Sequence, residues 1–152
     1  MHRKMKSIVV IWLMCFALWA LAEDTATTTN TDETDKYVLY NFVKANWFRA
    51  QAICASQNYT LISIPTYKVN EEINTYLLNS TEIIDEPIWA SGSNLANVNR
   101  WSWYSTGATF TFRRFSSPPG TAPRCVAHNG LTGDWTALSC TSERYFMCEK
   151  RC

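Results

Sequence analysis

The spacing of six cysteines constrains the fold of this chain more than any other feature. Five of them lie outside an apolar N-terminal run that holds Cys15, and these five are Cys54, Cys125, Cys140, Cys148 and Cys152. They do not form the two close pairs of a zinc ribbon or the ligand set of a zinc knuckle, since only Cys148 and Cys152 lie within a few residues of each other. The cysteines therefore predict disulfide bonds formed in an oxidising compartment, and no metal site.

The N-terminal residues predict a secretory signal. Residues 1–22 start with basic side chains, continue in an apolar run from Ile8 to Ala20, and end in the small-residue sequence Ala20-Leu21-Ala22. This is the three-part pattern of a cleaved signal peptide. The apolar run is shorter than the ~20 residues that a membrane anchor needs. We therefore expect a secreted, extracellular protein with no membrane span after removal of residues 1–22.

Residues 23–35 differ in composition from the rest of the chain. They contain five acidic residues and many threonines but almost no large apolar side chain. Such a segment cannot bury enough surface to offset the entropy lost on ordering. We predict a flexible, acidic, Thr-rich tail at 23–35 and one folded domain at 36–152, of a size at which secreted folds still use disulfides.

The first half of this domain predicts two helices. Asn46 is placed to cap a helix in which Trp47, Ala50 and Cys54 recur at helical spacing, and an apolar stripe predicts a second helix from Lys68 to Leu78. Strands are predicted at Tyr37–Val43 and Thr60–Ile64.

The second half predicts short strands. After Pro87 the sequence is rich in Trp, Tyr, Phe, Ser and Gly without a helical period. Strand candidates are 88–90, 101–104, 109–112, 125–128, around Trp135, and 145–148. Trp101 and Trp103 are two positions apart and so share a face, which we expect to be the core. Helices followed by strands predict an α+β fold.

Seven short motifs occur in an order that resembles one known family. They are Asn46-Trp47-Phe48-Arg49-Ala50, Leu61-Ile62-Ser63-Ile64, Trp89-Ala90-Ser91-Gly92, Trp101-Ser102-Trp103, Cys125-Val126, Gly133-Asp134-Trp135 and Phe146-Met147-Cys148-Glu149. Together they resemble a C-type lectin-like domain of the short, single-domain secreted type common in insects. The resemblance implies two helices with antiparallel sheets, a long loop, and disulfides that staple the fold.

The same resemblance implies a disulfide pattern. It pairs Cys54 with Cys148 and Cys125 with Cys140, although four cysteines permit three pairings and the sequence alone does not choose between them. Cys152 is left unpaired or intermolecular. We expect it to form a disulfide-linked dimer or a mixed disulfide, the alternative being that it replaces Cys148 in the bridge to Cys54.

Members of this family hold sugars through a calcium ion, and the residues at the matching positions here do not suit that ion. Calcium prefers six to eight oxygen ligands, many of them carboxylates. The matching positions hold Ser117, Pro119, Pro123, Thr136 and Ala137. Between Pro87 and Cys140 the only acidic residue is Asp134. We therefore expect neither a metal nor any other cofactor.

Basic and aromatic residues stand where those ligands would be. Between Pro87 and Gly133 there are four arginines and no acidic residue. Guanidinium groups suit carboxylate, sulfate or phosphate groups, and aromatic rings stack on sugars. The candidate ligand-binding residues are Arg113, Arg114, Phe115, Arg124 and Thr136.

The hypothesis is a secreted recognition module that binds a glycan, glycoprotein or protein partner, possibly anionic, without calcium. Alternatives are a calcium-dependent lectin with non-standard ligands and, in another class, a small secreted enzyme. The sequence offers no catalytic motif, and His128, the only histidine after the signal, is expected to be structural or on the surface. Asn58 and Asn79 each begin a glycosylation sequon. Nucleic acid is not an expected partner.

Overall fold

The computed structural model describes residues 36–151. The predicted signal at 1–22, the tail at 23–35 and the expected role of Cys152 all lie outside these residues. In the part described, no helix has the length and apolar character needed to span a membrane. Its elements are β1 (Tyr37–Ala45), α2 (Trp47–Ser56), β2 (Tyr59–Leu61), α3 (Tyr67–Leu78), β3 (Ile88–Ser93), β4 (Ser102–Trp103), β5 (Cys125–His128), β6 (Trp135–Leu138) and β7 (Arg144–Lys150).

Both helices begin at a side-chain cap. The Asn46 Oδ1 accepts a hydrogen bond from the Arg49 amide at 2.9 Å, and the Thr66 Oγ1 accepts one from the Val69 amide at 3.2 Å. Each cap satisfies an amide that has no partner within its own helix. One face of each helix is buried, through Trp47, Ala50 and Cys54 in α2 and through Asn70, Ile73 and Leu77 in α3.

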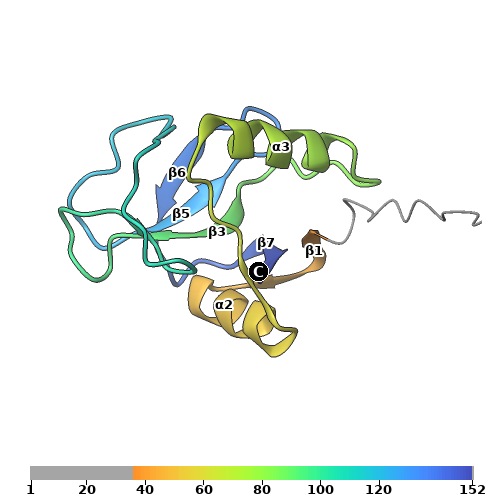
Figure 1. Cartoon of the computed structure of the whole chain (residues 1–152), viewed down its shortest axis with the longest axis horizontal. Coiled ribbons are helices and arrows are strands. Elements are labelled where there is room, and N and C mark those ends of the chain that lie inside the picture. Colours follow the sequence, from red (N-terminus) through yellow and green to blue (C-terminus); the bar gives the residue numbers. More distant parts are fainter. Residues whose placement is uncertain (1–35, 152) are drawn as a thin grey trace, which may run out of the picture. The chain divides into compact units, whose positions relative to one another are not determined.

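The strands form one mixed sheet in the order β1-β7-β3-β5-β6, with β2 also paired to β7 and β4 to β3. We expected antiparallel sheets, and this is wrong for one pair, because β3 and β7 are parallel. In the sheet, β7 lies between β1 and β3. It runs antiparallel to β1 and parallel to β3. Figure 1 shows α3 on one side of the sheet and α2 on the other.

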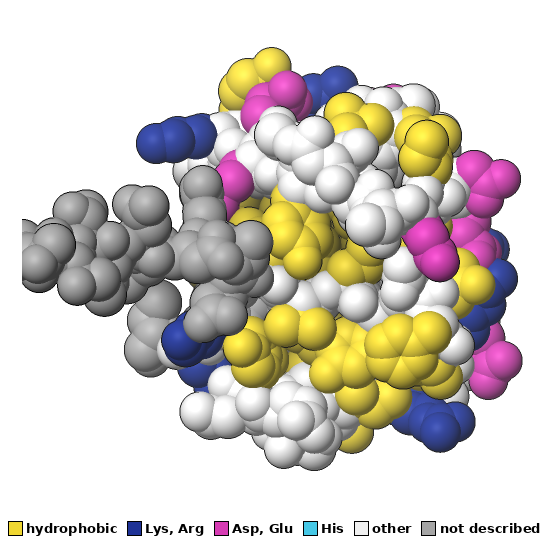
Figure 2. Space-filling view, turned by 90° about the vertical axis from the view of Figure 1, so that its right-hand side faces the viewer, with side chains coloured by type: hydrophobic (Ala, Val, Ile, Leu, Met, Phe, Trp, Pro, Cys, Tyr) yellow, Lys and Arg dark blue, Asp and Glu magenta, His cyan; other side chains and the backbone are white. Residues whose placement is uncertain are grey.

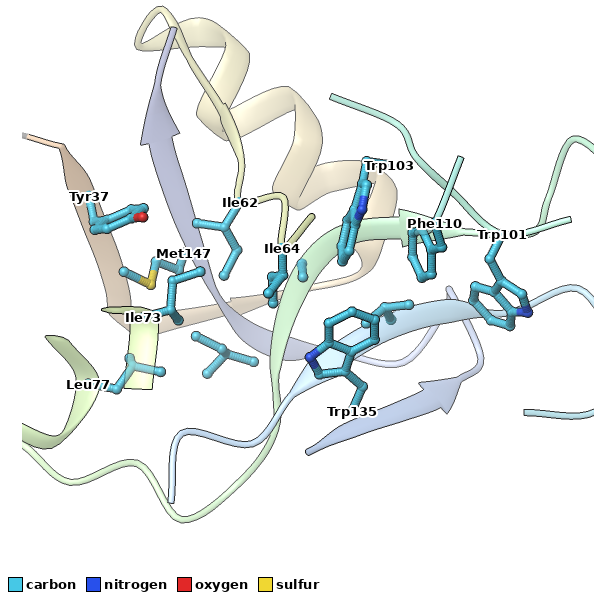
Figure 3. Close-up of a cluster of buried hydrophobic side chains, with 13 residues drawn as sticks. Tyr37, Ile62, Ile64, Ile73, Leu77, Trp101, Trp103, Phe110, Trp135 and Met147 are labelled. Carbon is cyan, nitrogen blue, oxygen red and sulfur yellow. The ribbon is translucent and has the colours of Figure 1, made fainter. Parts of the chain in front are cut away.

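The larger core cluster lies on the α3 side of the sheet. Trp101 and Trp103 are both buried in it, as their shared strand face predicted. The ring of Trp103 stacks on Phe110 with centroids 4.1 Å apart, and Trp135 meets both rings edge-on (Figure 3). Aromatic packing of this kind fixes the start of the long loop to the sheet.

The second core cluster lies on the α2 side and contains both disulfides. Cys54 is bonded to Cys148, and Cys125 to Cys140. The pairing that the family resemblance implied is therefore confirmed. The first bridge ties α2 to β7 across 94 residues, whereas the second closes 15 residues around β5 and β6.

Two predicted strands are shortened or lost. The segment predicted at 60–64 is a strand only to Leu61, because the Ser63 amide and hydroxyl both donate to the Glu149 carboxylate instead of continuing the backbone ladder. The predicted strand at 109–112 is absent. There only Thr109 forms a bridge, to Ser102, and the chain then turns so that Phe110 enters the core.

Candidate ligand-binding site

The predicted site residues lie around the hairpin of β5 and β6 and the long loop that leads into it. The loop is fixed at Phe115, which forms a parallel bridge with Trp135 at the start of β6. The Trp135 amide donates to the Arg114 carbonyl at 2.7 Å, and the Ser116 amide donates to the Trp135 carbonyl at 3.0 Å. These bonds place Phe115 beside Trp135, and its ring packs on the α3 side of the sheet. Successive strand residues face opposite sides of a sheet, so Thr136, which pairs with Ala127, faces the α2 side. The structure therefore does not bring the Phe115 and Thr136 side chains together.

Arg124 stands at the other end of the same hairpin. It directly precedes Cys125, whose partner in the register is Leu138, while Thr136 pairs with Ala127. A rise of about 3.3 Å per strand residue places Arg124 about 10 Å along the hairpin from the pair that contains Thr136. The structure thus sets Arg124 and Thr136 along one hairpin, whereas Phe115 lies on the long loop beside Trp135.

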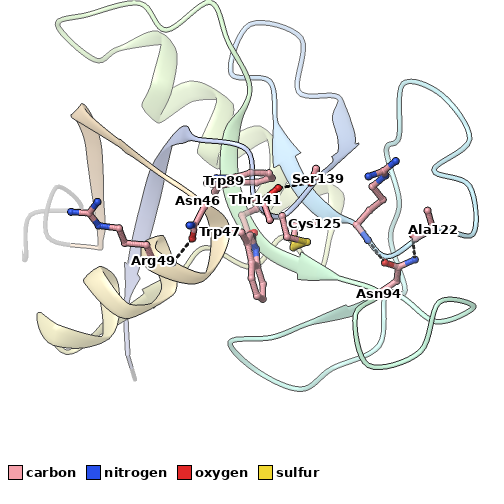
Figure 4. The surroundings of a disulfide bond; sticks show 12 residues. Asn46, Trp47, Arg49, Trp89, Asn94, Ala122, Cys125, Ser139 and Thr141 are labelled. Atoms are coloured by element: carbon pink, nitrogen blue, oxygen red, sulfur yellow. Dashed lines mark hydrogen bonds between the residues drawn. A yellow bond between two sulfur atoms is a disulfide. The ribbon is translucent and has the colours of Figure 1, made fainter.

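Asn94 holds the long loop, and sequence reasoning missed it. Its side chain is only 1% exposed and bonds three loop positions (Figure 4). The Oδ1 accepts from the Arg124 amide at 2.6 Å, and the Nδ2 donates to the carbonyls of Val98 at 3.1 Å and Ala122 at 3.0 Å. Such bonds satisfy buried polar groups that would otherwise cost stability. The signal available in the sequence was an asparagine directly after the end of β3 at Ser93.

The four arginines of this region do not share one environment. Arg114 donates from Nε to Asp134 at 3.1 Å and from Nη2 to the Thr132 carbonyl at 3.0 Å, and it pairs more distantly with Glu71. The expectation of an arginine cluster without a counter-charge is therefore wrong for Arg114. The reason is that Asp134 and Glu71 lie outside the acid-free segment and fold against it.

In the part of the chain that the structure describes, the other three arginines have no acidic partner. Arg100 and Arg113 are exposed and Arg124 is half-buried. Within residues 36–151, the ion pairs that form involve other basic side chains. Free guanidinium groups in this region attract anions and present paired donors to carboxylate, sulfate or phosphate oxygens.

The residues present do not fit the calcium ion that this kind of loop can hold. The side chains at the candidate positions offer the hydroxyls of Ser117 and Thr136, while Pro119, Pro123 and Ala137 offer none. The one nearby carboxylate, Asp134, is engaged by Arg114. Across the described chain, no three acidic, His or Cys side chains gather in a way that could hold a metal ion. A calcium site needs more charged oxygen than this loop supplies.

His128 lies in β5 opposite Trp135 and is fully buried. Among the residues that the structure describes, neither ring nitrogen has a hydrogen-bond partner. Burial, reinforced by the positive charge of Arg114, lowers the pKa of His128 from 6.5 to about 4. The expectation of a structural histidine fits this position, since a buried, neutral imidazole cannot reach a substrate in solvent.

Comparisons with known proteins agree with this architecture. A family model described as "Lectin C-type domain" matches residues 43–150. The "C-type lectin mosGCTL-7" of Culex quinquefasciatus is 32% identical over 138 residues, which is 82% of this chain and 79% of that protein. Two solved structures are similar in fold. Ovocleidin-17 of the Gallus gallus eggshell has a TM-score of 0.67 at 19% identity, covering 80% of this chain and 95% of that one. A calcium-independent type II antifreeze protein has a TM-score of 0.62 at 20% identity, covering 75% and 84%.

Proposed function

Because this chain belongs to the family of C-type lectin domains, we propose that it is a secreted, non-catalytic recognition module. It binds an anionic glycan, glycoprotein or protein partner through the long loop and the β5–β6 hairpin, without calcium. Two intramolecular disulfides support an oxidising compartment. The burial of His128 supports a binding role over a catalytic one.

One observation supports the proposal that the ligand is anionic. Arg113 and Arg124 lie on either side of residues 115–123, whose polar side chains are all neutral, and neither makes an ion pair within the described residues. Thr136 adds a half-buried hydroxyl on the hairpin, and Phe115 adds a half-buried ring on the loop beside Trp135. Arg114 is held by Asp134 and serves to position the loop rather than to meet the ligand.

We expect calcium to have no effect on the stability of this protein. The loop offers no free carboxylate, so titration to millimolar calcium should leave the melting temperature unchanged. A bound ion at a hundred times its Kd would add about 2.7 kcal/mol to the free energy of unfolding. Differential scanning calorimetry with calcium and with EDTA measures this, and a glycan array under the same two conditions tests ligand binding. A calcium-dependent rise in melting temperature would favour a lectin with non-standard ligands.

We expect binding to heparin-like or sialylated ligands to weaken steeply with salt and to depend on the two free arginines. Replacing Arg113 and Arg124 with serine should weaken binding about tenfold, since each exposed ion contact contributes up to ~1 kcal/mol. Surface plasmon resonance at several salt concentrations gives both the affinity and its salt dependence.

The matched control removes two positive charges elsewhere. Arg49 and Lys150 are exposed and form no ion pair in the described part of the chain. A double serine variant at these positions has the same net charge as R113S/R124S. If both variants lose equal affinity, only the overall charge matters, and the arginines are not the binding site.

A further inference from the structure

A groove of apolar side chains lies at the end of α3, away from the long loop. It is lined by Leu77, Leu78, Ile83, Ile84, Ile88 and Leu131. Three of these are strongly exposed, Leu78 at 54%, Ile83 at 73% and Leu131 at 46%. Figure 2 faces the side of the molecule where α3 ends and shows exposed hydrophobic side chains among polar ones. A contiguous exposed apolar patch of this kind marks an interaction site or a risk of aggregation, so we asked what could cover it.

A charged residue at the groove is already neutralised. Glu86 also lines it, and its carboxylate pairs with Lys44 and, at 2.9 Å, with Arg144. These pairs lower the pKa of Glu86, against the opposing effect of burial. The groove therefore presents apolar surface without a free charge to recruit a charged partner.

The sequon Asn79-Ser80-Thr81 lies in the turn between two residues that line this groove, Leu78 and Ile83. Asn79 is the exposed C-terminal cap of α3 and directly follows Leu78. The Ser80 Oγ lies 2.7 Å from the Leu77 carbonyl and 2.8 Å from the Glu82 carbonyl, and so ties the chain into a turn. This turn returns Ile83 and Ile84 to the side of α3, where they line the groove together with Leu78, the residue before Asn79.

We propose that Asn79 carries an N-linked glycan whose first sugar residues lie over the groove and cover Leu78 and Ile83. N-acetylglucosamine has an acetyl methyl group and apolar ring faces that pack against aliphatic side chains, while its hydroxyls stay in water. The covering group is thus attached to the chain beside the surface that it covers. This proposal does not depend on the ligand of the long loop.

The second sequon provides an internal comparison. Asn58 follows α2 with a φ of 63°, and Thr60 lies in β2, where it pairs with Glu149. None of the residues that line the groove belongs to this turn. A glycan at Asn58 would therefore leave the groove open, and its loss should not expose apolar surface.

The test uses the full chain secreted from mammalian cells. Thr81→Ala removes the Asn79 sequon without altering the helix cap, and Thr60→Val removes the other sequon without altering the left-handed Asn58. Intact mass should fall by one glycan in T81A. Binding of the dye 1-anilinonaphthalene-8-sulfonate should rise severalfold, and sedimentation should show self-association. T60V should show neither effect.

A third variant distinguishes shielding of the groove by the glycan from a general effect of the glycan on solubility. In the T81A background, Leu78→Ser with Ile83→Ser should return dye binding and sedimentation to the wild-type values. An unmodified Asn79 would overturn the proposal, as would dye binding and association that stay unchanged after glycan loss. A glycosylated wild type that already dimerises through Leu78 and Ile83 would show that a second copy covers the groove instead.

Discussion

Replacing both Cys54 and Cys148 with alanine is expected to lower the free energy of unfolding by about 4 to 5 kcal/mol, because the bridge closes a loop of 94 residues. Domains of this kind have a total stability of about 5 to 15 kcal/mol. The variant should therefore be largely unfolded at 37 °C and poorly secreted. Urea unfolding of purified protein, followed by tryptophan fluorescence, measures the loss.

The shorter bridge serves as the matched control. Replacing Cys125 and Cys140 with alanine opens a loop of 15 residues and should cost about 3 kcal/mol. Both bridges lie in the same core cluster, so the loss of sulfur packing is similar in the two variants. Equal losses would contradict an origin in loop length and would point to packing as the main contribution.

Acidification is expected to destabilise the protein through His128. Its pKa is about 4 in the folded protein, against an ordinary histidine value of 6.5. Between these values the unfolded chain binds the proton more readily, so stability is fully present above pH 6.5 and falls as the pH drops toward 4. The shift corresponds to about 3 kcal/mol of free energy of unfolding. Urea titrations at several pH values measure this decline.

His128→Leu isolates this effect, because leucine is apolar and does not titrate. The decline between pH 6.5 and 4 should be about 3 kcal/mol smaller in the variant than in the wild type. Burial raises the pKa of Glu149, which contributes with the opposite sign, but this contribution is common to both proteins. Parallel declines in the two proteins would show that other groups control acid sensitivity.

Helices and disulfides were predictable because their signals are local or shared with the family. The caps Asn46 and Thr66 directly precede apolar stripes, and α3 begins one residue before the predicted start at Lys68. The lost strand at 109–112 was not predictable from composition. Its alternating aromatic residues fit a strand, but Phe110 is buried against Trp103 and the chain turns away from the sheet.

The candidate site was only partly predictable, because its contacts join distant segments. The arginines were visible in the sequence, but the carboxylate that engages Arg114 depends on how Asp134 folds back on the loop. Likewise, nothing near Asn94 in the sequence indicates that it meets Ala122 and Arg124. Residue types thus predicted which chemistry is available, whereas tertiary contacts determine which groups remain free.

The position of β7 has a consequence for how the nascent chain matures. β7 joins β1 and β2 to β3, yet it is the last element of the domain to be synthesised. During synthesis, the two parts of the sheet have no strand between them, and Cys54 has no native partner until Cys148 emerges. The β5–β6 hairpin can close its own bridge earlier. Cys54 thus lacks its native partner for nearly the whole of the domain's synthesis, which leaves it open to mispairing and to disulfide exchange.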